Sequence, residues 1–317
     1  MQKSSRRTFL RTSANLAASV VLAGVEHGLG ALPAEPHVKF PTEPRARLAV
    51  ASWPFREFIE SPTNKWGRNP KVPGMDLKDF AAMVIRRFDV RGIEPLGQHF
   101  RSTELSYVRE LREATEKAGA HVVDVPTDVG PSFYDPDSAK RRTAVENGKK
   151  WVDIAQALGS PSIRAHIEGA PHVEPNVDRA AESLRQLAEY GAEKDVVINL
   201  ENDDNRTEDP FFIVQVLEKV NHPYLHALPD FCNSMLTHNQ EFNNRAMDAM
   251  FRHAYNIAHM KDSEVDGGKV YTVDVAKCFE SAKASGYRGY FSMEWEGAGE
   301  PYAGTQKLID ESLKSLA

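Results

Sequence analysis

Acidic and imidazole side chains recur at the ends of short apolar runs in the second half of the chain. Glu201 and Asp230 close two of these runs, and His259 and Glu294 lie at the ends of the last two. Three carboxylates drawn into one pocket would repel one another, and their pKa values would rise. A divalent cation removes that conflict, and three oxygen ligands with one imidazole suit Mn²⁺, Mg²⁺, Co²⁺ or Zn²⁺. These four residues therefore predict a site for one divalent metal ion that acts as a Lewis acid.

Each of the four residues has an ordinary structural explanation when it is taken alone. A glutamate at a strand end can cap a helix or lie at the surface, Asp230 could cap the next turn, and His259 could be a core histidine. Glu296 lies two residues after Glu294 on the same strand face, so either glutamate could be the ligand. The prediction depends on the joint placement of the four at the ends of consecutive runs.

The runs that carry these residues belong to a repeating pattern of apolar runs and helical stretches. The runs are short and mostly continuous, as expected for strands that are buried on both faces. The runs cover residues 48–53, 92–96, 122–125, 162–166, 196–200, 225–231, 257–260 and 290–295. The helical stretches cover 76–88, 103–118, 139–158, 176–194, 210–220, 239–254, 273–285 and 302–316, and Gly159, Gly191 and Gly286 are predicted at helix ends.

Eight strand–helix pairs within residues 47–317 predict a single-domain α/β fold, the (β/α)8 TIM barrel. A doubly wound open sheet is the main alternative. That fold usually carries a Gly-rich phosphate loop after an early strand, and neither GxGxxG nor GxxxxGK[ST] occurs in this sequence. In a barrel the C-terminal strand ends meet at one face, so the four candidate ligands should lie together there.

The first 35 residues have the pattern of an export signal. The letters SRRTFL at positions 5–10 precede an apolar run over 16–25, and paired arginines followed by Phe-Leu indicate the twin-arginine type. A frayed basic tail before a short helix is the alternative. The run is too short and too rich in Ala and Gly for a good membrane span, and no Cys follows it as a lipid anchor. We expect a signal peptide at 1–35, a linker at 36–46, a barrel at 47–317, and export to the periplasm by the twin-arginine machinery.

The composition is that of a globular protein and limits the partners. The 317 residues are 41% hydrophobic and 26% charged, with a net charge of -6. An acidic chain argues against a nucleic-acid partner, because duplex binding needs a basic face. Cys232 and Cys278 form neither a disulfide framework nor a CxxC motif, and each is predicted to be a buried thiol.

With these motifs the chain resembles the sugar phosphate isomerase/epimerase-like group of xylose isomerase-like barrels, from about residue 47 to the C-terminus. The resemblance is carried by NLEN at 199–202, Asp230, HMKD at 259–262, and GYRGY at 286–290 leading into EWEG at 294–297. It implies that Glu201, Asp230, His259 and Glu294 are the metal ligands. It also implies that Glu201 and Glu294 are the catalytic pair that removes and returns a proton beside a carbonyl.

Two positions beside this quartet depart from the family pattern. Many relatives carry a histidine where this chain has Asp203, and another that touches substrate where it has Asn233. These departures put the substrate in question more than the metal site. Five residues near the predicted strand ends are expected to bind substrate, although core packing is an equal alternative for the first of them: Trp53, Arg164, His166, Asn233 and Lys261.

The resemblance and the export signal together predict a metal-dependent isomerase or epimerase of a sugar or keto-sugar, acting through an enediolate. An exported enzyme meets free sugars and glycosides more often than sugar phosphates, so an unphosphorylated substrate is expected. A keto-sugar lyase or dehydratase on the same metal site is the nearest alternative, and a non-catalytic sugar-binding protein is another. A repair endonuclease of the same barrel type is disfavoured by the acidic charge and by export. A homo-oligomer is an open alternative to a monomer.

Overall fold

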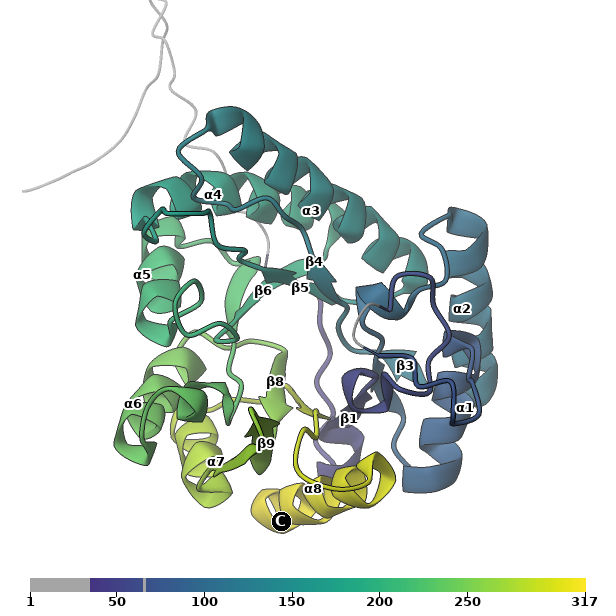
Figure 1. Cartoon of the computed structure of the whole chain (residues 1–317). Coiled ribbons are helices and arrows are strands. Elements are labelled where there is room, and N and C mark those ends of the chain that lie inside the picture. Colours follow the sequence, from purple (N-terminus) through teal and green to yellow (C-terminus); the bar gives the residue numbers. More distant parts are fainter. Residues whose placement is uncertain (1–34, 65–66) are drawn as a thin grey trace, which may run out of the picture. The chain divides into compact units, whose positions relative to one another are not determined.

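Parallel strands form the centre of the fold, at the positions that the apolar runs predict. The structure is a computed structural model that describes residues 35–64 and 67–317. The central strands are β1 (Leu48–Ala51), β2 (Gly92–Glu94), β3 (His121–Val122), β4 (Pro126–Asp128), β5 (Ser162–His166), β6 (Val197–Glu201), β7 (Leu225–Leu228), β8 (Ile257–Met260) and β11 (Tyr290–Met293). Figure 1 shows the helices as an outer ring around these strands. The predicted TIM barrel is confirmed.

The strands close into a barrel through two joins. The hydrogen-bonded orders are β3-β2-β1-β11-β8 and β4-β5-β6-β7. β3 and β4 are two halves of one extended segment, of which the first half pairs with β2 and the second with β5. At the other join, Asp230 forms a parallel bridge to His259, and His259 N donates to Pro229 O at 3.0 Å. The predicted ligands Asp230 and His259 are therefore aligned by backbone pairing.

The helices follow the strands as predicted, with small shifts at their ends. They are α1 (Leu77–Phe88), α2 (Leu105–Ala118), α3 (Ser138–Leu158), α4 (Val177–Lys194), α5 (Pro210–Val220), α6 (Gln240–Phe251), α7 (Val275–Ala284) and α8 (Pro301–Leu316). All of these except α2 begin after an Asp, Asn or Glu whose side chain accepts hydrogen bonds from the first turn. Such a cap stabilises a helix by about 1 kcal/mol.

The apolar side chains of α1 have the spacing of an amphipathic helix. Four of them, three or four residues apart, are buried: Phe80, Met83, Val84 and Phe88. Cys232 and Cys278 are both buried and unpaired, as predicted. Beneath the strand ends, the barrel interior also contains a polar layer, in which Asp124 accepts hydrogen bonds from Ser162 Oγ at 2.5 Å and Asn199 Nδ2 at 3.0 Å.

The predicted place of Gly191 at a helix end is wrong. α4 ends at Lys194, as the predicted stretch 176–194 does, and Asp195 after it has a left-handed φ of 54°. A Cβ at Gly191 would lie 2.5 Å from Val196 O. The glycine therefore allows the close approach of the returning chain, while Gly159 and Gly286 do lie at helix ends with positive φ.

An antiparallel hairpin between β8 and α7 was not among the predicted elements. It consists of β9 (Ser263–Asp266) and β10 (Lys269–Thr272). Gly267 and Gly268 both have positive φ, as a two-residue hairpin turn requires. The sequence indicates a turn here through the letters DGG at 266–268, but the flanking strands are too polar to be recognised as apolar runs.

The predicted signal peptide lies almost wholly outside the described residues, so it stays a prediction. The short helix η1 (Pro44–Arg47) crosses the boundary between the predicted linker, 36–46, and the barrel. Within the predicted linker, Phe40 packs edge-on against Tyr255 with ring centroids 5.3 Å apart. Among the helices of the described residues, none is long and apolar enough to cross a membrane.

Candidate active site

The four predicted metal ligands lie at the C-terminal ends of neighbouring strands. Glu201 is the last residue of β6, Asp230 comes two residues after β7, His259 lies in β8, and Glu294 follows β11 directly. Backbone pairing aligns these strand ends at the same level along the barrel axis. Asp230 forms a bridge to His259, and Glu294 N donates to Met260 O, in the residue after His259, at 3.1 Å. All four side chains are buried.

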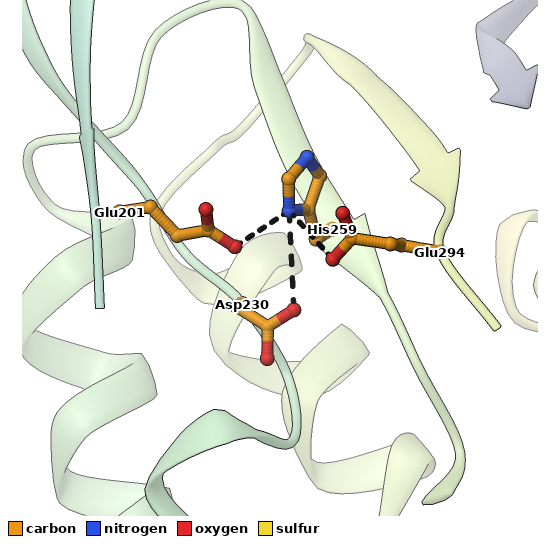
Figure 2. Close-up of side chains that lie close together, drawn as sticks. All are labelled: Glu201, Asp230, His259 and Glu294. Carbon is orange, nitrogen blue, oxygen red and sulfur yellow. Dashed lines mark hydrogen bonds and ion pairs between the residues drawn. The ribbon is translucent and has the colours of Figure 1, made fainter. Parts of the chain in front are cut away.

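One nitrogen, His259 Nδ1, lies at the centre of these four side chains. It is 2.6 Å from Glu201 Oε1, 3.1 Å from Glu294 Oε2 and 4.0 Å from Asp230 Oδ2. Figure 2 shows Glu201 and Glu294 reaching this nitrogen from opposite sides. One donor atom from each of the four residues lies within 4.8 Å of the other three. The structure therefore brings all four predicted ligands together.

The donor set fits a divalent cation. Glu201 Oε2 and Asp230 Oδ2 are buried oxygens that accept no hydrogen bond of good geometry within the described part of the chain, and their near contacts are ion pairs with Arg164 Nε at 2.9 Å and Lys261 Nζ at 3.4 Å. Such oxygens keep lone pairs that a bound ion or water can use. Three carboxylates and an imidazole are ligands that a hard or borderline dication accepts. The four residues thus form a candidate metal centre.

Burial and ion pairing act against one another on these side chains. Burial raises the pKa of Asp230 to about 7, and it also raises the pKa of Glu201. For Glu294, burial is outweighed by His259 and Lys261, which lower the pKa of that carboxyl. Burial opposes a charge on His259 as well, but the surrounding carboxylates raise the pKa of its imidazole well above the usual value.

Lys261, a predicted substrate contact, is enclosed by acceptor atoms. Its Nζ donates to Asn233 Oδ1 at 2.8 Å and lies 2.5 Å from Glu296 Oε2. Two predicted ligands are also close, with Glu294 Oε2 at 3.1 Å and Asp230 Oδ2 at 3.4 Å. Burial disfavours the ammonium, but these carboxylates outweigh it and raise the pKa of Lys261 well above its usual value. Lys261 is therefore an internal counterion of the cluster.

The same contacts distinguish the two candidate glutamates of the last strand end. Glu296 accepts a hydrogen bond from Trp53 Nε1 and pairs with Lys261. It does not belong to the group of four converging donors, whereas Glu294 does. The geometry thus favours Glu294 over Glu296 as the ligand.

Arg164 stands on the opposite side of the cluster as a second internal cation. Its Nε lies 2.9 Å from Glu201 Oε2, and its Nη2 lies 3.7 Å from Asp203 Oδ2. Burial acts against the charge, but Glu201 and Asp203 outweigh it and raise the pKa of Arg164. Each glutamate of the predicted catalytic pair thus has its own cation, Arg164 for Glu201 and Lys261 for Glu294.

The cluster opens into a pocket of about 470 Å³. The structure places all five predicted substrate contacts on its wall, together with both positions that depart from the family pattern. The lining residues are Trp53, Leu96, Gln98, Asp128, Arg164, His166, Glu168, Glu201, Asp203, Asn233, Lys261, Glu264, Glu294 and Glu296.

Sequence reasoning missed Glu94, which lies behind the candidate metal centre. Its Oε1 is 2.9 Å from His259 Nε2, and its Oε2 accepts a hydrogen bond from Ser292 Oγ at 2.5 Å. A carboxylate on the far nitrogen of a ligating histidine fixes the ring and its tautomer. The signal was visible, because Glu94 is a charged residue in the middle of the apolar run 92–96.

A second missed residue is Glu208, in the loop between β6 and α5. It is fully buried, and its Oε2 lies 2.9 Å from His166 Nδ1. No run or motif marked Glu208, because it falls in a polar segment, DDNRTED, where charged residues are usually exposed.

Comparison with known families assigns the barrel. A family model described as the xylose isomerase-like TIM barrel matches residues 84–317. The chain belongs to this family. The match includes all four candidate ligands of this xylose isomerase-like barrel, and it confirms the resemblance read from the sequence.

Solved structures with the same fold are distant in sequence. A D-allulose 3-epimerase from Methylomonas sp. is 15% identical, with a TM-score of 0.65 over 88% of this chain and 100% of that one. A xylose isomerase-like protein from Mycobacterium smegmatis in complex with magnesium is 16% identical, with a TM-score of 0.62 over 86% and 98%. A 3-keto-D-glucoside 4-epimerase from E. coli is 16% identical, with a TM-score of 0.58 over 75% and 94%. No curated protein sequence gives a significant match.

Proposed function

We propose that this xylose isomerase-like protein is a metal-dependent isomerase or epimerase that acts on an unphosphorylated keto-sugar through an enediolate. The observation that carries the proposal is the placement of Glu201 and Glu294 on opposite sides of His259 Nδ1 (Figure 2). Two carboxylates that face one another across a substrate carbon can take a proton from one side and return one to the other. Two of the structural neighbours are sugar epimerases, which supports this class of reaction.

Glu201, Asp230, His259 and Glu294 would hold the metal. A bound dication supplies a Lewis acid that polarises the substrate carbonyl and favours loss of the adjacent proton. Glu201 and Glu294 move that proton. Arg164 holds the Glu201 carboxylate at 2.9 Å. Lys261 holds the Glu294 carboxylate at 3.1 Å, so both bases are kept in position before substrate arrives.

The charges of the pocket support a substrate without a phosphate. Seven of its lining residues are acidic: Asp128, Glu168, Glu201, Asp203, Glu264, Glu294 and Glu296. Arg164 and Lys261 are the permanent cations among the lining residues, and both are already paired with these carboxylates. His166, the remaining basic side chain of the wall, is paired with Glu208. A phosphate would therefore meet like charge and cations that already have carboxylate partners, whereas hydroxyl groups can donate to the carboxylates.

Pocket size and the Trp53 side chain fit a sugar ring. A volume of about 470 Å³ lies in the range of small-molecule sites. Trp53 belongs to the short helix η2 (Trp53–Phe55), and its Nε1 donates to Glu296 on the pocket wall. This bond holds the indole beside the cavity, where its face can pack on the apolar side of a sugar ring.

Solvent isotope exchange tests the proposed function. The full chain, supplied with Mn²⁺, is incubated in D₂O with D-allulose and other free ketoses, and with glycosides oxidised to the 3-ketone. Deuterium is expected at a carbon beside the carbonyl. Glu201→Gln and Glu294→Gln are each expected to lower exchange by about 10² to 10⁴, while Glu113→Gln, at an exposed position of α2, keeps it. Sugar binding without exchange by the wild type would instead identify a binding protein.

Metal analysis tests the candidate ligands directly. About one divalent ion per chain is expected in the folded protein, because one group of four converging donors is available. His259→Ala is expected to lose the ion, whereas His172→Ala, which changes an exposed histidine, should retain it. Full metal occupancy in His259→Ala would show that the ligand assignment is wrong.

A further inference from the structure

The pocket contains an acid–base group that proton transfer between Glu201 and Glu294 does not use. His166 ends β5, and its side chain is 22% exposed and lines the pocket. Its Nδ1 lies 2.9 Å from Oε2 of Glu208, a carboxylate that is fully buried. The carboxylates of Glu208 and Asp203 outweigh the burial of the ring and raise the pKa of His166 to about 9. The imidazole is therefore protonated at neutral pH.

The carboxylate beside the His166 ring is itself held in place. Glu208 Oε1 accepts a hydrogen bond of 2.6 Å from the backbone N–H of Ile167, the residue that follows His166. Within the described residues, the ion pairs of the ring both use Nδ1, with Glu208 at 2.9 Å and with Asp203 Oδ2 at 3.6 Å. Nε2 is thus the ring nitrogen that remains for a molecule in the pocket.

The ion pairs of His166 do not include the predicted catalytic pair. Within the described residues, the ring pairs with Asp203 and Glu208 and with neither Glu201 nor Glu294. The neighbouring cation Arg164, which contacts Glu201 Oε2 at 2.9 Å and Asp203 Oδ2 at 3.7 Å, does not give up its proton in a protein. His166 is therefore the proton donor that this side of the pocket offers.

We infer that the Glu208–His166 pair is a general acid for a substrate oxygen, and that it gives this site a β-elimination activity on keto-glycosides. The inference rests on the proposed function, because elimination begins with the same removal of a proton beside the carbonyl. Epimerisation needs no third acid, since one glutamate takes the proton and the other returns it. Expulsion of an alkoxide does need one.

The elimination step balances without a redox partner. One glutamate takes the proton from the carbon next to the ketone, and the C–H electron pair forms the enediolate. When the enediolate collapses, a C=C bond forms and the bond from the β carbon to the leaving oxygen breaks with its electrons on oxygen. His166 Nε2–H protonates that oxygen. The products are an unsaturated ketone and an alcohol.

A second divalent cation is the alternative occupant of this place, because donor atoms of His166, Asp203 and Glu208 also lie within 4.8 Å of one another. One observation favours the acid: both oxygens of Glu208 already accept backbone N–H groups, from Ile167 and from Asp204.

The test uses two 3-keto-β-glucosides that differ in their leaving group, methanol and 4-nitrophenol, with the full-length protein and Mn²⁺ in D₂O. Wild type is expected to release both. His166→Asn keeps a polar partner for Glu208 but removes the acid, so release of methanol should fall about 100-fold or more. Release of 4-nitrophenolate, a good leaving group, should fall only a few-fold, and deuterium exchange should persist. His172→Asn, in the loop after β5, is the matched control.

The outcomes separate the two proposals. Exchange by the wild type without alcohol release, or equal losses for both leaving groups in His166→Asn, would overturn the acid role and leave the proposed function in place. A second metal ion per chain that His166→Asn loses would also overturn it. Absence of exchange in the wild type would overturn the proposed function, and the acid role with it.

Discussion

Glu94 shows how a single residue behind the candidate metal centre can control it. The carboxylate lies 2.9 Å from His259 Nε2 and leaves Nδ1 to face Glu201, Asp230 and Glu294. Residues in such positions fix the tautomer and orientation of a ligating imidazole. Glu94 is therefore a positioning residue for the proposed site.

Glu94→Gln is expected to weaken metal binding by about 10- to 100-fold, because the amide orients the His259 ring less strongly than the carboxylate does. Affinity for Mn²⁺ can be measured by titration of the metal-depleted protein. Glu168→Gln, which removes a pocket carboxylate outside the ligand cluster, is the control and should leave affinity unchanged. Equal affinity of Glu94→Gln and wild type would refute the positioning role.

His99 bears on the stability of the protein at low pH. It is buried in the short helix η3 (Gly97–His99), and its Nδ1 lies 2.8 Å from Ser52 Oγ. Burial lowers the pKa of His99 to about 3. The unfolded chain binds the proton near pH 6.5, so stability is present above that pH and is lost as the pH falls toward 3.

At pH 5 this histidine alone should lower the free energy of unfolding by about 2 kcal/mol relative to pH 8. Urea unfolding of wild type and His99→Gln at both pH values measures the effect. The variant should lose part of the pH dependence even if its stability is lower throughout. An unchanged difference between the two pH values would contradict the role of His99.

At the scale of elements, the hairpin β9–β10 connects the candidate metal centre to the surface. Glu264 in β9 and Lys261, two residues before β9, both line the pocket. Lys261 Nζ lies 3.6 Å from Glu264 Oε2. Its outer residues Val265 and Val270 are 39% and 49% exposed. The hairpin therefore shapes the pocket without adding to the barrel core.

Replacement of residues 264–271 by Asn-Gly between Ser263 and Thr272 should preserve the barrel, since these two residues already pair across the hairpin. We expect a rise in KM for the keto-sugar with metal content retained. Thermal unfolding and metal analysis serve as controls. A shortened protein that no longer binds metal would show that the hairpin belongs to the metal centre itself.

The barrel could be predicted because parallel strands buried on both faces appear as continuous apolar runs. The grouping of the four candidate ligands could be predicted because the C-terminal ends of all the strands of a TIM barrel lie at one face. Glu208 and the hairpin could not be predicted in this way. The place of Glu208 depends on a tertiary contact, the Glu208–His166 pair, which joins segments about 40 residues apart and leaves no periodic signal. The hairpin is local, and its signal is the DGG turn rather than an apolar run.

At the scale of the whole molecule, we propose that the protein is exported through the twin-arginine pathway. The motif SRRTFL and the apolar run after it support this proposal. The double substitution Arg6→Lys and Arg7→Lys should block export, because the pathway recognises the arginine pair. The folded variant should then accumulate in the cytoplasm. Fractionation of cells that express both forms measures this. Recovery of the doubly substituted protein from the periplasm would contradict the proposal.

Lys261 and Arg164 bear on the order of events during biogenesis. Both side chains pair with carboxylates of the acidic cluster from within the chain, which reduces the repulsion among these carboxylates while no ion is bound. A protein built in this way can complete folding first and acquire its ion later. The choice between ions then follows from which one the finished protein meets first. In a chain exported after folding, that choice would fall to the cytoplasm, where the supply of zinc can be kept from outcompeting weaker-binding Mn²⁺ or Mg²⁺.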